Sequence, residues 1–187
     1  MRTIKQIYSK TAFSIIEVMI GVFIFSLWLV AIYALLISSL SLSEYNKNAI
    51  IASQLAVEQI ELIRNVRDTN YKITAAWDNI PRGWNFTKGF FTVENDPLNW
   101  HVHITEIPNF REWVSELANM ESYRLCLSPD NVYIYDCSSA RETYFYRYLQ
   151  IEPIDTKQLK LTSKVIWHAR WYHEFDIQTI ITDWRRL

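Results

Sequence analysis

The feature that most constrains this chain is the apolar run from Phe13 to Ile37, which contains no Lys, Arg, Asp, Asn or Pro. As an α-helix rising about 1.5 Å per residue, the run spans about 37 Å, which is enough to cross the hydrocarbon core of a bilayer. It carries a single charged side chain, Glu17. We therefore predict a hydrophobic helix over residues 13–40 that can lie in a membrane or in the core of a filament.

The charges that flank the run predict its orientation. The twelve residues before it contain Arg2, Lys5 and Lys10 and no acid, so the positive-inside rule places the N-terminus in the cytoplasm and the remaining chain across the membrane. A cleaved secretory signal peptide begins in the same way. The run is about twice as long as the apolar core of such a signal, and the polar residues after it continue a helical pattern. A helix kept in the mature protein is therefore favoured.

Glu17 requires an explanation of its own. A carboxylate near the end of a membrane helix costs on the order of 1 to 3 kcal/mol relative to an apolar residue. One account is an acid in the first helical turn, favoured by the helix macrodipole. The other is a partner charge: after a cut between Ala12 and Phe13, the new α-amino group of this chain or a neighbour would lie about one helical turn away, and an assembly could neutralise both charges.

The sequence "KTAFSIIEVMIGVF" (residues 10–23) resembles the class III signal and processing site of type IV prepilins and of the related pseudopilins of type II secretion. The resemblance implies that residues 1–12 are a basic leader cut after Ala12, that Phe13 becomes N-methylated, and that Glu17 recruits the preceding subunit during assembly. The family usually has Gly before the cut, where this chain has Ala12, a tolerated small residue. Major pilins often have a Pro in mid-stem, and its absence here favours a minor subunit.

The same resemblance implies partners and a location. The partners are prepilin peptidase, other pilin subunits that pack through their stem helices, and the pilus assembly platform of the inner membrane. The protein would be a single-pass protein of the cytoplasmic membrane before assembly and part of an extracytoplasmic or cell-surface filament afterwards. No cofactor is implied.

Residues 41–72 predict an amphipathic continuation of the helix, because neither Gly nor Pro occurs from Ser41 to about Tyr71. Apolar residues recur there at helical spacing, with charged residues toward the other side. A domain or a partner helix could cover such a stripe, and the chain that follows supplies a cover. The phrase "LAVEQIELIRNVRDTNY" (residues 55–71) further resembles the stem end of minor-pilin-like sequences. The stripe consists of Ile51, Leu55, Leu62 and Val66 with Ala52, Ala56 and Ile63 beside it; the charged residues are Glu58, Glu61, Arg64 and Arg67.

Residues 73–187 predict an extracytoplasmic β-sheet domain. After a turn-rich loop at 77–86, with Pro81 and Gly83, the pattern changes to period two in "WHVHITEI" (residues 100–107). The fold class is therefore α+β, a pilin-like long N-terminal helix packed against one antiparallel sheet that ends in a meander. The ending resembles the closing hairpin of pilin-like chains, which often finishes near a Trp-Arg pair, here Trp184 and Arg185. Further strands are expected at 123–127, 132–135, 144–151, 163–171 and 175–184, with a short helix at 111–120.

Cys126 and Cys137 flank "LSPDNVYIYD", a hairpin-like unit whose turn is "SPDN". If this region lies outside the cytoplasm, the two thiols are expected to pair, whereas in the cytoplasm they would stay reduced. A bond closing this loop would stabilise the fold by roughly 3 kcal/mol. Two buried free thiols are the alternative.

Other constellations predict little chemistry. Two pairs of histidines, His101 with His103 and His168 with His173, lack the spacing of a known zinc motif, so no metal site is expected. The chain has 3 Gly and no Gly-rich phosphate loop or nucleophile elbow, so we expect no catalytic residues and no enzymatic activity. "NFT" at Asn85 matches a glycosylation sequon, a pattern common by chance.

The sequence therefore predicts a structural subunit of a type IV pilus or pilus-like filament, more in keeping with a minor pilin. A secretion pseudopilin shares every N-terminal feature. A tip subunit for adhesion or DNA uptake is a further alternative, whose marker would be an exposed aromatic and basic strip. The formal charge of −1 gives a nucleic-acid partner no general support. The strip would consist of Arg141, Arg147, Lys157, Lys160 and Lys164.

Overall fold

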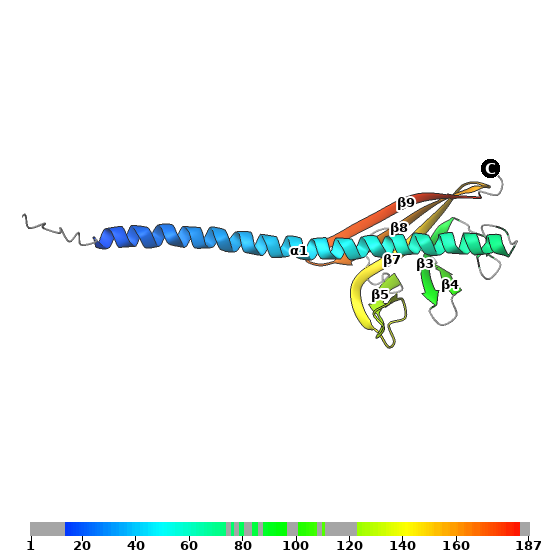
Figure 1. Cartoon of the computed structure of the whole chain (residues 1–187), viewed down its shortest axis with the longest axis horizontal. Coiled ribbons are helices and arrows are strands. Elements are labelled where there is room, and N and C mark those ends of the chain that lie inside the picture. The colour runs from blue at the N-terminus through cyan, green and yellow to red at the C-terminus, as the bar shows by residue number, and fades with distance from the viewer. Residues whose placement is uncertain are drawn as a thin grey trace, which may run out of the picture. The chain divides into compact units, whose positions relative to one another are not determined.

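The computed structural model describes residues 14–73, 76, 79–80, 84–85, 88–96, 101–107, 110 and 123–183. The chain divides into two compact units, residues 1–44 and residues 45–187, which we call the N-terminal unit and the sheet unit. One helix, α1 (Ile15–Lys72), supplies residues to both units (Figure 1). The predicted α+β fold is confirmed, since the sheet unit packs its part of this helix against an antiparallel sheet.

α1 begins directly after Ser14. The backbone amides of Glu17 and Val18 both donate hydrogen bonds to the carbonyl oxygen of Ser14, at 3.0 and 3.2 Å. The chain from Val22 to Lys72 contains neither Gly nor Pro, the two residues that most disfavour a helix interior. Lys72 in the last turn places a positive charge at the negative end of the helix dipole.

The described strands form two antiparallel sheets. A two-stranded sheet pairs β1 (Asn79–Ile80) with β2 (Trp84–Asn85), and a seven-stranded sheet contains the others. The strands of the larger sheet are β3 (Gly89–Asp96), β4 (His101–Glu106), β5 (Arg124–Leu127), β6 (Tyr133–Ile134), β7 (Arg141–Asp155), β8 (Gln158–His168) and β9 (Tyr172–Thr182).

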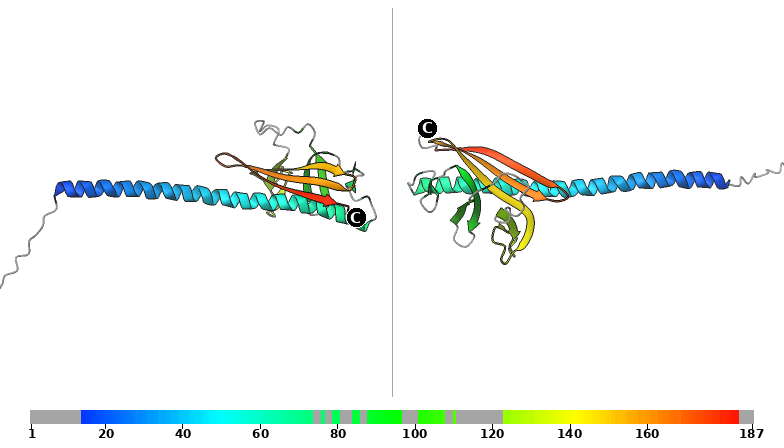
Figure 2. Two further views of the ribbon diagram at one scale, coloured as in Figure 1. Left: turned by 90° about the horizontal axis from the view of Figure 1, so that it is seen from above. Right: turned by 180° about the vertical axis from the view of Figure 1, so that it is seen from behind.

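β7 organises the larger sheet. Along one edge it pairs with β8, which pairs in turn with β9 (Figure 2). Along the other edge it pairs with β5 near its start and with β3 near its end, so the β3–β4 and β5–β6 hairpins both attach there. The meander predicted at the end of the chain is therefore confirmed in the last three strands.

The core lies between the sheet and residues of α1 that belong to the sheet unit. Because side chains alternate along a strand, every second residue from Phe145 to Ile151 of β7 and from Leu159 to Trp167 of β8 enters this core. Full burial of one such aliphatic side chain contributes about 1.5 to 3 kcal/mol. One cluster contains Ile63, Phe91, Val93, Leu149, Ile151, Leu159, Leu161 and Ile181, and a second contains Ala52, Leu55, Ala56, Leu125, Phe145, Val165 and Trp167.

The buried stripe of α1 differs in part from the predicted one. Leu55 and Val66 are buried as expected, together with the smaller residues beside them. Ile51 and Leu62 are only half-buried, however, while Asn48 and Gln59 are almost fully buried. The predicted stripe did not include these two amides, although helical spacing places Asn48 one turn from the buried Ala52 and Gln59 one turn from the buried Leu55.

Several predicted element bounds need correction. β7, β8 and β9 begin at Arg141, Gln158 and Tyr172, earlier than the predicted starts at 144, 163 and 175. β3 was not predicted, and the predicted loop at 77–86 contains the short strands β1 and β2. The predicted helix at 111–120, Pro81, Gly83 and the Trp184–Arg185 pair lie outside the described residues.

The predicted disulfide between Cys126 and Cys137 is present, with a Cα–Cα distance of 5.4 Å. Between the two cysteines, β5 and β6 pair around the predicted turn at residues 128–131. The amide of Asn131 donates to the carbonyl of Ser128 at 3.0 Å. Asn131 has φ 61°, a left-handed conformation that asparagine tolerates better than most residues, so its identity suits this turn.

Candidate assembly surface and the polar centre of the sheet unit

The N-terminal unit presents an uncovered apolar helix surface. Every residue from Ser14 to Lys47 is exposed, including the large aliphatic and aromatic side chains. By length and composition, α1 is able to cross a membrane. Soluble monomers rarely expose an apolar surface this extensive. Such a surface is typical of a segment that lies in lipid or against other protein chains.

Glu17 is the single charged residue between Ser14 and Ser43. It lies in the first turn of α1, at the third helical position, and its side chain is exposed. Ser14 directly before the helix and Glu17 three residues later match the Ser-x-x-Glu spacing of a capping box, and the negative charge lies at the positive end of the helix dipole. The predicted cleavage and methylation residues, Ala12 and Phe13, lie outside the described residues.

No contact within the described chain requires a glycine at position 21. A methyl group added at its Cα would meet no atom within 4 Å, and glycine in a helix interior costs about 1 kcal/mol relative to alanine. In membranes, small residues of this kind allow helices to approach closely. Gly21 is therefore suited to contact with another helix one turn from Glu17.

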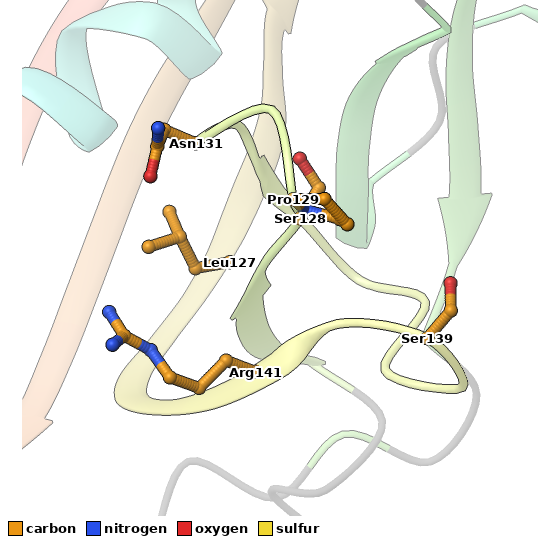
Figure 3. Close-up of a pocket in the computed structure, with 6 residues that line it drawn as sticks. All are labelled: Leu127, Ser128, Pro129, Asn131, Ser139 and Arg141. Carbon is orange, nitrogen blue, oxygen red and sulfur yellow. The ribbon is translucent and has the colours of Figure 1, made fainter.

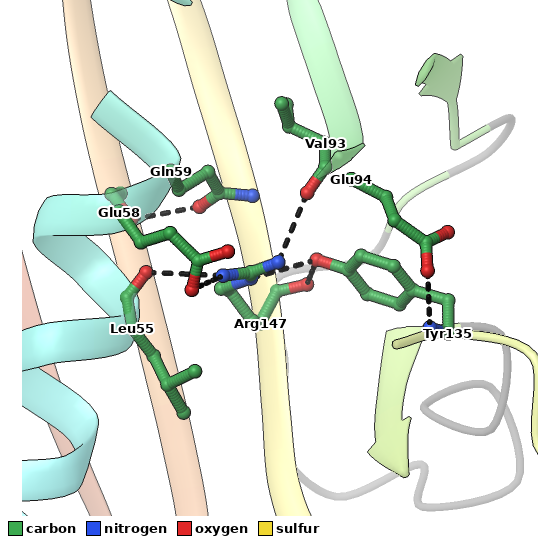
Figure 4. Close-up of polar contacts among 8 residues, drawn as sticks. Leu55, Glu58, Gln59, Val93, Glu94, Tyr135 and Arg147 are labelled. Carbon is green, nitrogen blue, oxygen red and sulfur yellow. Dashed lines mark hydrogen bonds and ion pairs between the residues drawn. The ribbon is translucent and has the colours of Figure 1, made fainter. Parts of the chain in front are cut away.

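The sheet unit contains a fully buried arginine, Arg147, on β7 (Figure 4). From α1, the carbonyl oxygen of Leu55 and the carboxylate of Glu58 accept hydrogen bonds from its guanidinium at 3.2 and 3.1 Å. From the other elements, the carbonyl of Val93 and the hydroxyl of Tyr135 accept at 3.0 and 3.1 Å. One side chain therefore joins α1, β3, β7 and the segment after β6.

The electrostatics of this cluster follow from burial and from the guanidinium charge. Burial raises the pKa of Tyr135, although the adjacent Arg147 acts in the opposite direction. Burial acts to lower the pKa of Arg147, but the facing Tyr135 and Glu58 outweigh it, so the net direction is upward and the group stays charged. Burial also raises the pKa of Glu94, whose carboxylate accepts a hydrogen bond from the Tyr135 amide at 3.3 Å.

A second buried polar contact joins α1 to β8. The hydroxyl of Ser163 donates to Oε1 of Gln59 at 2.7 Å, and both side chains are fully buried. The Nε2 atom of Gln59 has no hydrogen-bond partner among the described residues. A buried amide with one unsatisfied donor costs stability, so this contact holds the helix and strand in register at an energetic cost.

The sequence interpretation missed the role of Arg147 and assigned it to an exposed basic strip, which is wrong. Arg147 is inaccessible, and two other members of that strip are already paired, Lys160 with Glu152 at 3.8 Å and Lys164 with Glu174 at 3.2 Å. The sequence did contain a pattern that indicates the burial of Arg147. Arg147 shares the strand period of Phe145 and Leu149, so a charge at that position of the apolar face indicated a buried ion pair.

The histidines occupy different environments. His103 and His168 are exposed, whereas His173 is half-buried between Tyr45 and Trp167, with ring centroids 5.0 and 5.3 Å away. Among the described residues, no group of three or more His, Cys, Asp or Glu side chains is arranged to hold a metal ion.

A hollow beside the disulfide loop has a volume of about 280 Å³ and is shown in Figure 3. Leu127 lies between the side chains of Asn131 and Arg141, with Ser128, Pro129 and Ser139 completing the lining. Small-molecule pockets usually have volumes of about 300 to 1,000 Å³ and mainly apolar walls. This hollow lies below that range of volumes, so we do not assign a ligand to it.

The fold and the exposed helix define the class of protein coarsely: an α+β chain with a disulfide-linked hairpin and one helix able to cross a membrane. Comparison of the chain with protein-family models, with curated proteins and with solved structures finds no match.

Proposed function

We propose that this protein is a structural subunit of a type IV pilus or pilus-like filament, of the minor-pilin kind, that assembles through its N-terminal helix. The single observation that carries the proposal is the uncovered apolar surface of α1, interrupted by one carboxylate in its first turn. The resemblance of residues 10–23 to prepilin processing sites supports the same function.

The apolar surface permits a transfer between two environments. Lipid chains and the stems of neighbouring subunits are similarly apolar, so moving the side chains of the N-terminal unit from one to the other changes their free energy little. The helix can therefore anchor the subunit in the membrane before assembly and later enter the core of a filament.

Glu17 supplies the direction of that transfer. An unpaired carboxylate is unfavourable in lipid. In a filament, the N-methylated α-amino group of Phe13 from a neighbouring subunit would lie beside it and neutralise it. Because a shifted register would leave both charges unpaired, the correct register is preferred.

The test compares Glu17→Ala with Glu44→Ala, a matched removal of an exposed acid from the same helix. We expect both variants to insert in the membrane and to be cut after Ala12, and only Glu17→Ala to disappear from the sheared filament fraction. Mass spectrometry of the N-terminus and immunoblots of membrane and filament fractions measure these outcomes. Normal incorporation of Glu17→Ala would refute the role of the carboxylate. An N-terminus at Met1 in membrane-extracted protein would refute the prepilin assignment itself.

A further inference from the structure

A hollow of about 530 Å³ lies in the sheet unit, where β5, β7, β8 and β9 meet. Its volume falls within the range of about 300 to 1,000 Å³ that is typical of small-molecule sites. Its lining combines aromatic rings with one oppositely charged pair of side chains. Neither the filament proposal nor the fold accounts for this combination.

Aromatic side chains form much of the lining. His168 and Tyr172 are cross-strand neighbours of β8 and β9, with ring centroids 4.8 Å apart. Tyr172 is 38% exposed and Tyr144 is 44% exposed. The Tyr144 hydroxyl donates to Oδ1 of Asn48 at 3.3 Å, which holds that ring in place. Rings of this kind present apolar faces at the surface while their hydroxyls keep a hydrogen-bond partner.

The polar part of the lining is an ion pair. The guanidinium of Arg124 lies 2.6 Å from the carboxylate of Glu142 and donates a second hydrogen bond to the Tyr146 hydroxyl at 3.2 Å. Arg124 also lies over the Tyr146 ring, 5.6 Å from its centroid. The pair offers a rigid donor and an acceptor side by side, while its opposite charges largely cancel. A ligand with net charge would have to compete with the pair, whereas a neutral ligand with adjacent donors and acceptors can use both members.

We propose that this hollow binds a neutral saccharide. A pyranose ring has an apolar C–H face that packs on an aromatic ring, here Tyr172; Tyr144 also lines the hollow. The vicinal hydroxyls of the pyranose can accept from the Arg124 guanidinium and donate to the Glu142 carboxylate at the same time. The inference rests on the sheet unit alone and does not depend on the proposed filament function.

The experiment uses the full chain in a polyoxyethylene detergent, which carries no sugar. Saturation-transfer NMR is recorded separately with cellobiose, with chitobiose, with choline chloride and with a short single-stranded thymidine oligonucleotide. We expect transfer to the ring C–H protons of at least one disaccharide at millimolar concentration and none to choline or to the oligonucleotide. Absence of transfer to both disaccharides overturns the proposal, as does Tyr172-dependent binding of choline or the oligonucleotide in their place.

Matched variants locate the binding. Tyr172→Ala is expected to weaken disaccharide binding about tenfold, equivalent to about 1.4 kcal/mol, whereas Tyr172→Phe keeps the ring and retains binding. Gln178→Ala, on the same strand outside the hollow, serves as the control. Circular dichroism checks that each variant is folded. Undiminished disaccharide binding by folded Tyr172→Ala overturns this assignment, and because assembly is not measured, the filament proposal stands or falls separately.

Discussion

The two parts of α1 use the same helical backbone in opposite ways. From Ile15 to Glu44 the side chains are almost all apolar and all exposed. In the part that belongs to the sheet unit, the helix buries polar groups, including Asn48 and Gln59, and its Glu58 is paired with a buried arginine. Apolar character alone therefore does not decide burial in this chain. The more apolar part, before Tyr45, is not covered by any described residue of the chain, while the less apolar part is covered by the β-sheet that follows it.

The largest expected difference between the two parts of α1 comes from truncating one leucine in each. Leu55→Ala should lower the free energy of unfolding of the sheet unit by about 3 kcal/mol, because Leu55 is 3% exposed and its removal leaves a cavity. Leu29→Ala, at an exposed position in the N-terminal unit, should leave it unchanged. Denaturant unfolding of the full chain in detergent, followed by near-ultraviolet circular dichroism, measures both. Equal losses would show that the N-terminal unit contributes to the stability of the sheet.

A second test compares two acids on α1. Glu58→Ala should cost about 3 kcal/mol, because it leaves the fully buried Arg147 charge without its carboxylate partner. Glu61→Ala removes an exposed ion pair with Arg64 and should cost less than about 0.5 kcal/mol. The same unfolding experiment applies. A small effect at Glu58 would mean that the hydrogen bonds from Arg147 to Leu55, Val93 and Tyr135 suffice to keep its charge buried.

A third test asks whether the buried side chains of Gln59 and Ser163 stabilise the fold as a pair. Gln59→Leu should cost about 1 to 2 kcal/mol, because the Ser163 hydroxyl loses its acceptor. The double variant Gln59→Leu with Ser163→Ala should recover most of that loss, since neither group is then unpaired. A double-mutant cycle of unfolding free energies measures the coupling. If the double variant is as unstable as the sum of the single variants, the two side chains act independently.

The smallest expected effect concerns pH. Burial raises the pKa of Glu94 in the folded chain above its unfolded value. Between the unfolded and the folded pKa, the folded state therefore binds more protons than the unfolded state. The contribution of Glu94 to the free energy of unfolding falls as pH rises through this range. The unfolding free energy of Glu94→Gln minus that of wild type should thus be larger at pH 7 than at pH 4. The difference should be at most about 1 kcal/mol, because the half-buried carboxyl group is partly screened by solvent.

Unfolding curves of wild type and Glu94→Gln at the two pH values provide the measurement. Glu106→Gln, on the exposed side of β4, is the matched control. An unchanged pH dependence in Glu94→Gln would show that attraction to Arg147 offsets the burial of the carboxylate.

The sequence by itself determined the features that depend on local pattern. The apolar run from Phe13 to Ile37, the helical spacing after it and the period-two strands predicted an α+β fold, and the pattern between Cys126 and Cys137 predicted the hairpin and its disulfide. These features are local because helix and strand periods, turn residues and cysteine spacing act over a few residues.

The tertiary structure alone decided which groups the buried polar residues contact and how the strands before β8 are ordered. Arg147, Gln59 and Asn48 contact acceptors and donors from distant segments, and the identity of these partners has no signature in a local pattern. The pairing of β7 with β3 and β5 likewise depends on contacts between strands that are not consecutive in the chain. The same holds for the hollow at Tyr172, whose residues come from four strands, since only folding brings side chains distant in sequence within reach of one ligand.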